Sequence, residues 1–361
     1  MAATLTARAV KLPPVAAWLR TNLFGSVTSA IISLILLYLL YQLAVGALNW
    51  LVFDAVWSAD NMRSCHAAGS GACWAFVREK WRFILFGRYP FEEQWRAALV
   101  TFILFGLTGL SFMPRLWRLE LLYLWIAGVI VAGVLMFGGV LGLTYVPTDE
   151  WSGLPLTLGL SLFSMILAFP LAVLLALGRR SNLLIIKLLC TGAIEFMRGV
   201  PLITMLYTAS LMLPIFLPPG IQIDKTLRAL IGITLFLAAY QAEDVRGGLQ
   251  AIPKGQFEAA DALGLGYWQK MWHVILPQAI AVVIPPLVSN LIGNFKNTSL
   301  VSIISLYDLL QDAEQSLVDP NWRGLTAEAY IFVSVIYFVV CYSMSRYSQW
   351  LERRLNRGKR R

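Results

Sequence analysis

Long apolar runs constrain this chain more than any other feature of its sequence. Several runs of about 20 residues carry few charges, which is the length that an α-helix needs to cross the hydrocarbon core of a membrane. Only 14% of the 361 residues are charged and 58% are hydrophobic, whereas soluble domains carry about 25% charged residues. We therefore predict an all-α membrane protein and exclude a soluble globular fold.

Apolar runs separated by charged residues predict eight spans. The predicted spans lie near residues 26–53, 97–113, 120–146, 154–177, 200–217, 227–245, 278–293 and 327–348. The first run starts near Ser26 and is far longer than the apolar core of a signal peptide, so we expect it to stay attached as the first span.

The distribution of basic residues predicts the orientation of the chain. Lys and Arg precede the first span, separate the second from the third, follow the fourth and fill the tail at residues 351–361. Acidic residues dominate the opposite loops, around residues 149–150 and 308–319. Because positively charged loops stay in the cytoplasm, both termini and the loop at residues 246–277 are expected there. The net charge of +9 is then explained by orientation beside anionic lipid rather than by nucleic-acid binding.

The loop at residues 54–95 is expected on the periplasmic side, although its basic and acidic residues nearly cancel. It contains Cys65 and Cys73, separated mainly by Gly and Ala residues. On the oxidising side of the membrane such a pair can close a small disulfide loop. The alternative is two unpaired thiols in a flexible loop.

A polar stretch at residues 250–266 interrupts the apolar pattern of the second half. Pro253 breaks the preceding helix and Gln256 is expected to cap a short new one. Glu258 then falls in the first turn, where a carboxylate is favoured by the helix dipole. Gly264 supplies the backbone freedom that a sharp helix end needs. A compact helix with its own start and stop signals in an aqueous loop indicates a docking site for a partner.

The spacing of these residues resembles a known signature. Glu258-Ala-Ala, followed by Gly264 and then by Ile275-Leu-Pro277, resembles the cytoplasmic loop of permease subunits of bacterial ATP-driven importers. Four further strings, at residues 177–181, 195–202, 240–256 and 295–302, resemble the polar-amino-acid branch of that family, the histidine-type permeases. The first half is more weakly similar to the general L-amino-acid permeases, which also carry extra N-terminal spans.

The resemblance implies a division of the chain and a set of partners. A three-span N-terminal extension at residues 1–150 would precede a five-span permease core at residues 151–350. The partners would be a homologous permease in a heterodimer, a cytoplasmic ATPase dimer and a periplasmic amino-acid-binding protein. The short helix would fit a cleft on the ATPase. The residues implied in this coupling are Phe257, Glu258, Ala259, Ala260, Asp261 and Gly264.

Four polar residues near span ends are candidates for contact with an amino-acid substrate. Glu243 offers a carboxylate to an ammonium group, or it pairs with Arg246 as scaffold. Lys296 offers a cation to a carboxylate, while Asn294 and Thr298 offer neutral hydrogen bonds. The alternative for these last three residues is a solvated re-entrant turn. Glu195 and Arg198 lie one helical turn from each other and are expected to form a structural ion pair.

Missing motifs narrow the function. The sequence has no Gly-rich phosphate loop ending in Gly-Lys-Ser/Thr, and no catalytic or metal-binding constellation. We therefore expect a transport subunit of the bacterial inner membrane, neither an enzyme nor a cofactor carrier, with ATP and Mg²⁺ bound by the partner ATPase. The alternative is an ion-coupled secondary amino-acid transporter, which would carry carboxylates deep in several spans.

Overall fold

The computed structural model describes residues 18–19, 21–218 and 220–357. The described chain is helical nearly throughout, so the predicted all-α class is confirmed. Residues 1–17 and the last four residues of the basic tail predicted at 351–361 lie outside the described part. Packing divides the chain into one unit at residues 1–76 and a second at residues 77–361.

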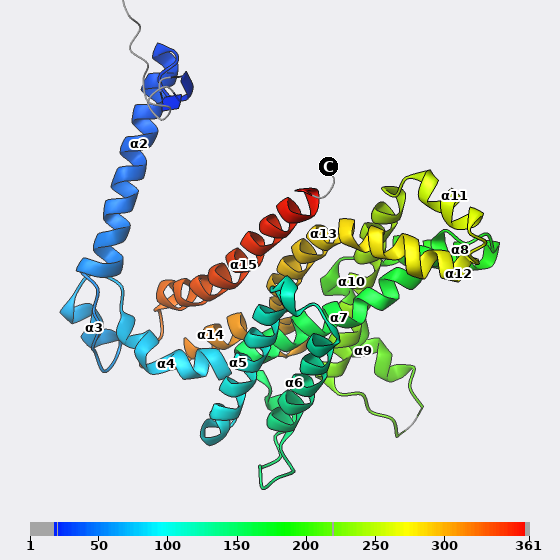
Figure 1. Ribbon diagram of the computed structural model, residues 1–361. Coiled ribbons are helices and arrows are strands. Elements are labelled where there is room, and N and C mark those ends of the chain that lie inside the picture. The colour runs from blue at the N-terminus through cyan, green and yellow to red at the C-terminus, as the bar shows by residue number, and fades with distance from the viewer. Residues whose placement is uncertain (1–17, 20, 219, 358–361) are drawn as a thin grey trace, which may run out of the picture. The chain divides into compact units, whose positions relative to one another are not determined.

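The first unit contains a long apolar helix and a small cross-linked loop (Figure 1). Helix α2 (Val27–Leu48) continues into the π-helical turn η1 (Asn49–Phe53), and Ser26 caps its start by accepting a hydrogen bond from the Ser29 backbone N–H. No residue of α2 is buried, as expected of a span whose apolar side chains face lipid.

The loop of the first unit contains a disulfide between Cys65 and Cys73. Helix α3 (Met62–Ala68) carries Cys65, and the side chains of Asn61 and Ser64 form a reciprocal capping box at its N-terminus. Val56 pairs with Cys73 as an isolated parallel bridge. A loop rich in small residues is thereby held by one covalent bond, one cap and one bridge.

The second unit holds the remaining helices. In chain order these are α4 (Trp74–Phe86, which starts in the first unit), η2 (Phe91–Glu93), α5 (Gln94–Ser111), η3 (Pro114–Leu116), α6 (Leu119–Phe137), η4 (Thr148–Glu150), α7 (Gly153–Arg179), α8 (Leu184–Gly199), α9 (Leu202–Ile215), α10 (Lys225–Gln250), α11 (Lys254–Ala262), α12 (Tyr267–Lys270), η5 (Met271–Ile275), α13 (Leu276–Asn297), η6 (Thr298–Ile304), α14 (Leu309–Ser316) and α15 (Thr326–Arg357). The short strand β1 (Tyr307–Asp308) pairs with residues 152–153 just before and at the start of α7.

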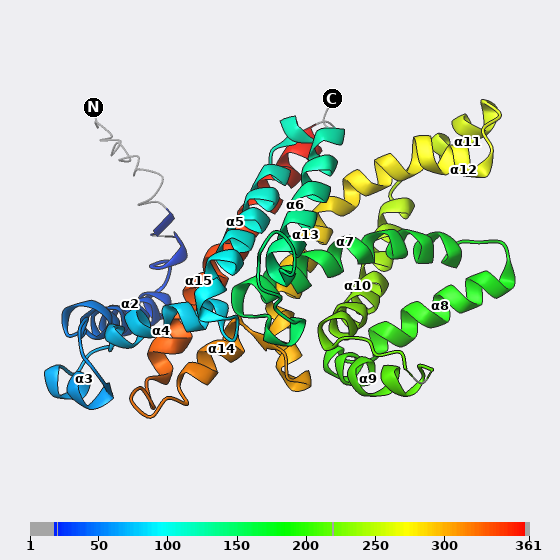
Figure 2. The ribbon, with the colours of Figure 1, turned by 90° about the horizontal axis from the view of Figure 1, so that it is seen from below.

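Helices α7 and α10 form the centre of the second unit and pack along each other, while α8, α9 and α13 pack around α10. Two apolar clusters lie along this pair. One joins α7, α8, α10 and α13 beneath α11, and the other joins α7, α9, α10 and η6. Helices α11 and α14 lie at opposite ends of the unit in both views (Figures 1 and 2).

Helix α10 lies close against α13 at Gly248. A methyl group added there would lie 2.3 Å from Val283 Cγ2 and 2.9 Å from the Ala279 carbonyl oxygen. A methyl group added at the adjacent Gly247 would meet no atom within 4 Å. Only one of the two glycines is therefore required by packing.

Replacing Gly248 with alanine is expected to destabilise the protein by about 1–3 kcal/mol, because the added methyl forces α10 away from α13. Gly247→Ala serves as the matched control and is expected to be neutral or to stabilise by up to about 1 kcal/mol. Unfolding of both variants in detergent, followed by circular dichroism, measures the difference. Equal midpoints for the two variants would refute the close approach.

Five helices of the described part are long and apolar enough to cross a membrane, or six if the bent pair α8–α9 is one span. The five are Val27–Phe53, Leu119–Phe137, Gly153–Arg179, Tyr267–Ile304 and Thr326–Arg354. The predicted span at residues 200–217 falls on α9 of the bent pair. The other two coincide with α5, which carries Gln and Arg at its start, and α10, which carries charged residues at both ends. The count of eight spans remains a prediction.

The bend between α8 and α9 follows from its sequence. Helix α8 ends at Gly199, and Pro201 precedes the first residue of α9. Proline disfavours helical backbone in the residue before it, here Val200, which is extended with φ −99° and ψ 131°. The two helix axes consequently meet at 107°.

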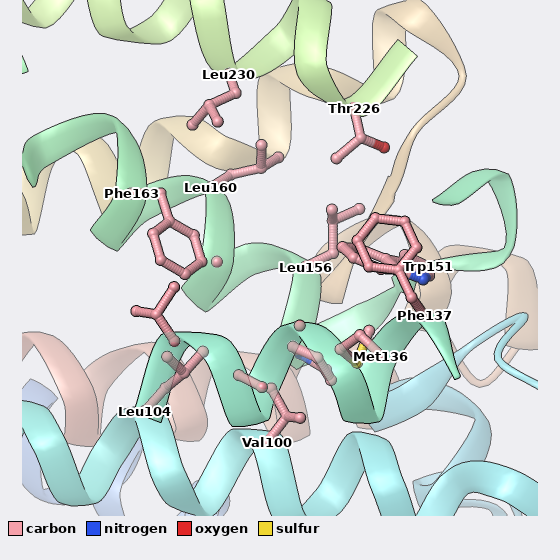
Figure 3. A pocket seen from close by; sticks show the side chains of 15 residues that line it. Val100, Leu104, Met136, Phe137, Trp151, Leu156, Leu160, Phe163, Thr226 and Leu230 are labelled. Atoms are coloured by element: carbon pink, nitrogen blue, oxygen red, sulfur yellow. The ribbon is translucent and has the colours of Figure 1, made fainter. Parts of the chain in front are cut away.

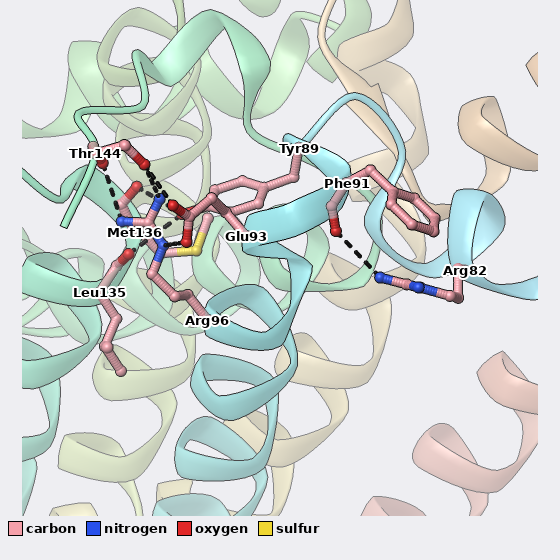
Figure 4. A network of polar contacts seen from close by, with 8 residues as sticks. All are labelled: Arg82, Tyr89, Phe91, Glu93, Arg96, Leu135, Met136 and Thr144. Atoms are coloured by element: carbon pink, nitrogen blue, oxygen red, sulfur yellow. Dashed lines mark hydrogen bonds and ion pairs between the residues drawn. The ribbon is translucent and has the colours of Figure 1, made fainter.

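A buried arginine ties α5 to the segment that follows α6 (Figure 4). Arg96 is fully buried, and its Nε lies 3.0 Å from Glu93 Oε2. Its Nη1 donates to the Thr144 carbonyl oxygen at 3.1 Å, and the Thr144 hydroxyl donates to Glu93 Oε1 at 2.6 Å. The Tyr89 hydroxyl donates to the carbonyl oxygens of Leu135 and Met136 at the end of α6.

Gly138 makes this arrangement sterically feasible. Its φ is +64°, and a Cβ there would lie 2.0 Å from the Thr144 carbonyl oxygen. Helix α5 also packs against α7, so two of the three spans of the predicted extension belong to the same packed unit as the predicted core. The boundary predicted at residue 150 divides the sequence into a part without motifs and a part with them. The packing units meet at a different place, between residues 76 and 77.

Candidate functional site

The polar stretch at residues 250–266 forms the predicted short helix, α11, at Lys254–Ala262. The helix starts earlier than expected. Pro253 is its N-cap, and the Pro253 carbonyl oxygen accepts from the Gln256 backbone N–H at 3.0 Å. Gln256 therefore lies inside the helix, where its side-chain oxygen accepts from Gln278 at 3.0 Å, and Glu258 lies beyond the first turn. Proline starts the helix without an unsatisfied N–H, because it has none.

The end of α11 is a Schellman motif centred on Gly264. The Gly264 N–H donates to the Asp261 carbonyl oxygen at 2.9 Å, and the Leu265 N–H donates to the Ala260 carbonyl oxygen at 3.2 Å. Gly264 has φ +71°, the left-handed conformation that such an end requires. Gly266, in contrast, has φ −63° and starts α12.

Helix α11 has a buried face and an exposed face. Ala260 is 2% exposed, and Phe257 packs half-buried against the apolar cluster of α7, α8, α10 and α13. Arg180 lies over the Phe257 ring, 5.9 Å from its centroid. The exposed face presents Glu258, Ala259, Asp261 and Ala262. The helix is thus anchored to the core on one side and open to a partner on the other.

Large apolar side chains are exposed at the end of α11 and in the segment that follows it. Leu263 is 78% exposed, Trp268 66% and Trp272 70%. Lys270 forms an ion pair with Asp261, which fastens α12 to α11. The sequence prediction did not include these three apolar residues. The signal for the two tryptophans was the aromatic content of residues 267–272, in a loop expected to be aqueous.

A network of arginines surrounds Glu243 near the end of α10. Arg179 of α7 lies 3.1 Å from Glu243 Oε2 and 2.9 Å from Glu195 Oε1, and Arg198 of α8 lies 3.7 Å from Glu243. Arg246 forms a further ion pair with Glu243. Glu195 therefore pairs with Arg179 rather than with Arg198, which was the expected partner. The arrangement links α7, α8 and α10 through a single carboxylate.

The neighbouring Asp244 connects α10 to α13. Its Oδ2 accepts a hydrogen bond from Asn290 Nδ2 at 2.6 Å, and both residues are half-buried. Together with Gly248 this contact fixes α13 against α10 along the stretch that leads to α11. Sequence reasoning missed Arg179 and Asn290 as partners because they approach from helices far away in the sequence.

The other substrate candidates lie at the end of α13. Asn294 is buried and donates to the Ser161 carbonyl oxygen at 3.0 Å and to Ser164 Oγ at 2.9 Å, both on α7. Thr298 is buried and donates to the Phe295 carbonyl oxygen at 2.8 Å. Lys296 and Asn297 are exposed. The structure therefore separates this string into buried residues that hold the helices and exposed residues that remain available.

Two buried carboxyl groups lie at the opposite end of the unit from α11. Asp308 caps α14 by accepting from the Gln311 N–H at 3.0 Å, and it accepts from the Tyr337 hydroxyl at 3.1 Å. Asp312 is fully buried on α14, and burial raises its pKa well above the ordinary value of 3.8. Asp319, in the following loop, is held by Lys80 at 2.6 Å, and this hydrogen bond lowers the pKa of Asp319.

These two aspartates are expected to have opposite effects on acid stability. A carboxyl whose folded pKa is raised destabilises the fold once it is charged, so stability falls as pH rises from about 3.9 through the folded pKa of Asp312. A carboxyl whose folded pKa is lowered contributes stability that is lost as pH falls below about 3.9, the case of Asp319.

Asp312→Asn is therefore expected to raise the thermal midpoint at pH 7 and to flatten its dependence on pH. Asp319→Asn, the control on the surface, is expected to lower or leave unchanged the midpoint at pH 7. Thermal unfolding of the detergent-solubilised protein between pH 4 and pH 8 measures both. A lower midpoint for Asp312→Asn at pH 7 would contradict the burial of a costly charge.

The described residues contain no group of three or more His, Cys, Asp and Glu side chains arranged to hold a metal ion. The geometry instead combines interhelical ion pairs, an anchored surface helix and apolar spans.

The comparisons with known proteins agree with this description. Residues 158–357 match the family described as binding-protein-dependent transport system inner membrane component, and the chain belongs to this family. It is 44% identical over 348 residues to the inner membrane amino-acid ABC transporter permease protein YhdY of Escherichia coli (strain K12), covering 95% of this chain and 93% of the relative.

Other relatives differ in how much of the chain they match. The glutamate/glutamine/aspartate/asparagine transport system permease protein BztC of Rhodobacter capsulatus is 39% identical over 411 residues, covering 95% of this chain and 94% of the relative. The probable glutamine ABC transporter permease protein GlnM of Bacillus subtilis is 33% identical over 202 residues, which cover 56% of this chain but 91% of the relative.

A solved structure, described as an amino acid ABC transporter with histidines, is 32% identical with a TM-score of 0.48. It covers 55% of this chain and 90% of that chain.

Proposed function

We propose that this chain is a permease subunit of an ATP-driven importer that moves polar or a broad range of L-amino acids from the periplasm to the cytoplasm. Membership in the permease family and relatives named as amino-acid ABC permeases support this function. The single observation that carries the mechanism is the anchored helix α11. Its buried face is fixed to the core, so a force on its exposed face moves α7, α10 and α13.

The exposed face of α11 is the proposed docking site for the ATPase. Glu258, Ala259 and Asp261 would contact the ATPase, and Phe257 and Ala260 would transmit its movement to the core. Gly264 keeps the helix end compact. ATP and Mg²⁺ would bind to the ATPase dimer and no cofactor to this chain. In the orientation predicted from the basic residues, α11 and both termini lie in the cytoplasm, and the disulfide loop lies in the periplasm.

The substrate path is proposed to run between this chain and a homologous permease, fed by a periplasmic amino-acid-binding protein. Lys296 is exposed and offers a cation for the substrate carboxylate. Asn294 and Thr298 support the same turn from within. Glu243 would act on substrate only by exchanging an arginine partner for an ammonium group, so its first role is to hold α7, α8 and α10 together.

The three N-terminal spans are proposed to be an extension of a five-span core. The relative GlnM is matched over 91% of its length by 56% of this chain, which fits a core that exists without the extension.

A photo-crosslinking residue placed at Ala259 tests the docking site directly. We expect it to capture an ATPase subunit when the transporter is expressed with all its subunits. The same residue at Val318, which is 59% exposed at the end of the unit that carries α14, serves as the control and should capture none. Equal capture at both positions, or none at Ala259, would refute the docking site.

The ion-coupled alternative has no support in the comparisons, because the relatives above are named as ABC or transport-system permeases. The two hypotheses differ in the energy source for transport. An ion-coupled transporter would accumulate amino acids in vesicles without ATP.

A further inference from the structure

An apolar cavity of about 240 Å³ lies within the second unit, between the N-terminal extension and the core. Its walls come from α5, α6, α7 and α10 (Figure 3). Helix α5 packs against both α6 and α7, and the cavity is the space that remains between these helices. The residues that shape it include Leu104, Met136, Leu160, Phe163 and Leu230.

The chemistry of the wall excludes the proposed substrate. No charged side chain lines the cavity, and nearly all of its surface is hydrocarbon. An amino acid carries an ammonium and a carboxylate, and each would be buried there without a partner, at a high cost in free energy. The wall therefore selects an uncharged, chain-like molecule.

Two polar groups in the wall distinguish one end of the cavity. The indole Nε1 of Trp151 and the hydroxyl of Thr226 are buried and have no hydrogen-bond partner among the described residues. Both side chains lie on the same side of the cavity, where α7 and α10 begin (Figure 3). Burying a donor without an acceptor is unfavourable, so this end fits an occupant that brings one.

The surroundings supply such a molecule. Helices α6 and α7 are two of the apolar spans, so lipid is the solvent around the cavity. Phe137 forms part of the wall, packs edge-on to Trp151 with ring centroids 4.6 Å apart, and is 41% exposed, so this side of the wall borders the outer surface of the unit. A phospholipid tail combines a hydrocarbon chain with an ester carbonyl, which is an acceptor at one end.

We propose that this cavity binds one acyl chain of a membrane phospholipid, with the ester carbonyl directed toward Trp151 and Thr226. A small rotation of the Thr226 side chain turns its hydroxyl toward the occupant. The bound lipid would then contact both the extension and the core, and it would hold α6 against α7.

Gly133 offers a way to block the site without disturbing the packing. It lines the cavity on α6, and a Cβ added there meets no atom within 4 Å. Gly133→Phe should therefore fill the cavity. Gly106→Phe is the matched control, because Gly106 is exposed on α5, has equal free space and does not line the cavity.

The test uses quenching of tryptophan fluorescence by phosphatidylethanolamine with dibrominated stearoyl chains. The full chain, purified in detergent, is titrated with this lipid, and a Trp151→Phe variant reports the signal of the other tryptophans. We expect saturable quenching of Trp151 at about one lipid per chain, retained in Gly106→Phe and lost in Gly133→Phe. Thr226→Val should weaken the affinity by roughly threefold to tenfold, the effect of one lost hydrogen bond.

Three outcomes would overturn the proposal. The first is quenching that rises without saturation and equally in all variants, which indicates general contact with detergent-borne lipid. The second is equal quenching by free dibromostearate, which assigns the site to fatty acid. The third is unchanged affinity in Thr226→Val. Thermal midpoints of Gly133→Phe and Thr226→Val at or above that of the unmodified chain exclude misfolding as the cause of lost binding.

Discussion

Replacing Gly264 with valine is expected to reduce ATP-driven uptake at least tenfold while the subunit still inserts and assembles. Gly264 has φ +71°, a conformation that costs a β-branched residue about 1–3 kcal/mol. Relief of this strain opens the Schellman motif and displaces the end of α11, on which the proposed docking depends. Uptake and substrate-stimulated ATP hydrolysis in proteoliposomes measure the effect.

Gly264→Asn separates backbone conformation from side-chain bulk. Asparagine is close to valine in size but tolerates the left-handed conformation. A Cβ at this position meets no atom of this chain within 4 Å, so neither variant creates a clash within the subunit. We expect Gly264→Asn to retain most of the activity. Equal loss in both variants would show that bulk against the partner, rather than the shape of α11, controls coupling.

Replacing Glu93 with glutamine is expected to destabilise the second unit by about 3 kcal/mol. Arg96 is fully buried and Glu93 is its only ion-pair partner among the described residues, so the variant leaves a buried cation without a counter-charge. This value is at the low end for a broken buried pair, because the Glu93 side chain is 21% exposed.

The neighbouring Glu92 provides the control for this prediction. It is exposed, so Glu92→Gln should change stability by less than about 0.5 kcal/mol. Unfolding in detergent by denaturant compares the two variants. If both leave the midpoint unchanged, the guanidinium of Arg96 is solvated and the network in Figure 4 contributes little.

Features set by local sequence were predicted well. The short helix at residues 254–262 follows from Pro253 and Gly264, each of which acts on the backbone within a few residues. Pro201 likewise acts locally where it separates α8 from α9. The helical class follows from apolar length, because a chain in lipid must satisfy its backbone hydrogen bonds internally.

Features set by packing could not be predicted. The Glu243 network depends on Arg179 approaching from α7, across 64 residues of sequence. One-turn spacing favoured a Glu195–Arg198 pair, but each side chain pairs with a residue on another helix instead. The packing of α5 on α7, which joins two of the three spans of the extension to the core, left no sign in the sequence. The N-cap of α11 was placed too late because glutamine was preferred over proline as the cap.

Uptake of a labelled amino acid into proteoliposomes tests the central claim most directly. The vesicles would contain this chain, its homologous permease and the ATPase, with the binding protein added outside and ATP enclosed. We expect accumulation that requires hydrolysable ATP, stops with a non-hydrolysable analogue and is unaffected by a collapsed ion gradient. Accumulation without ATP, driven by the ion gradient alone, would contradict an importer that is powered through α11.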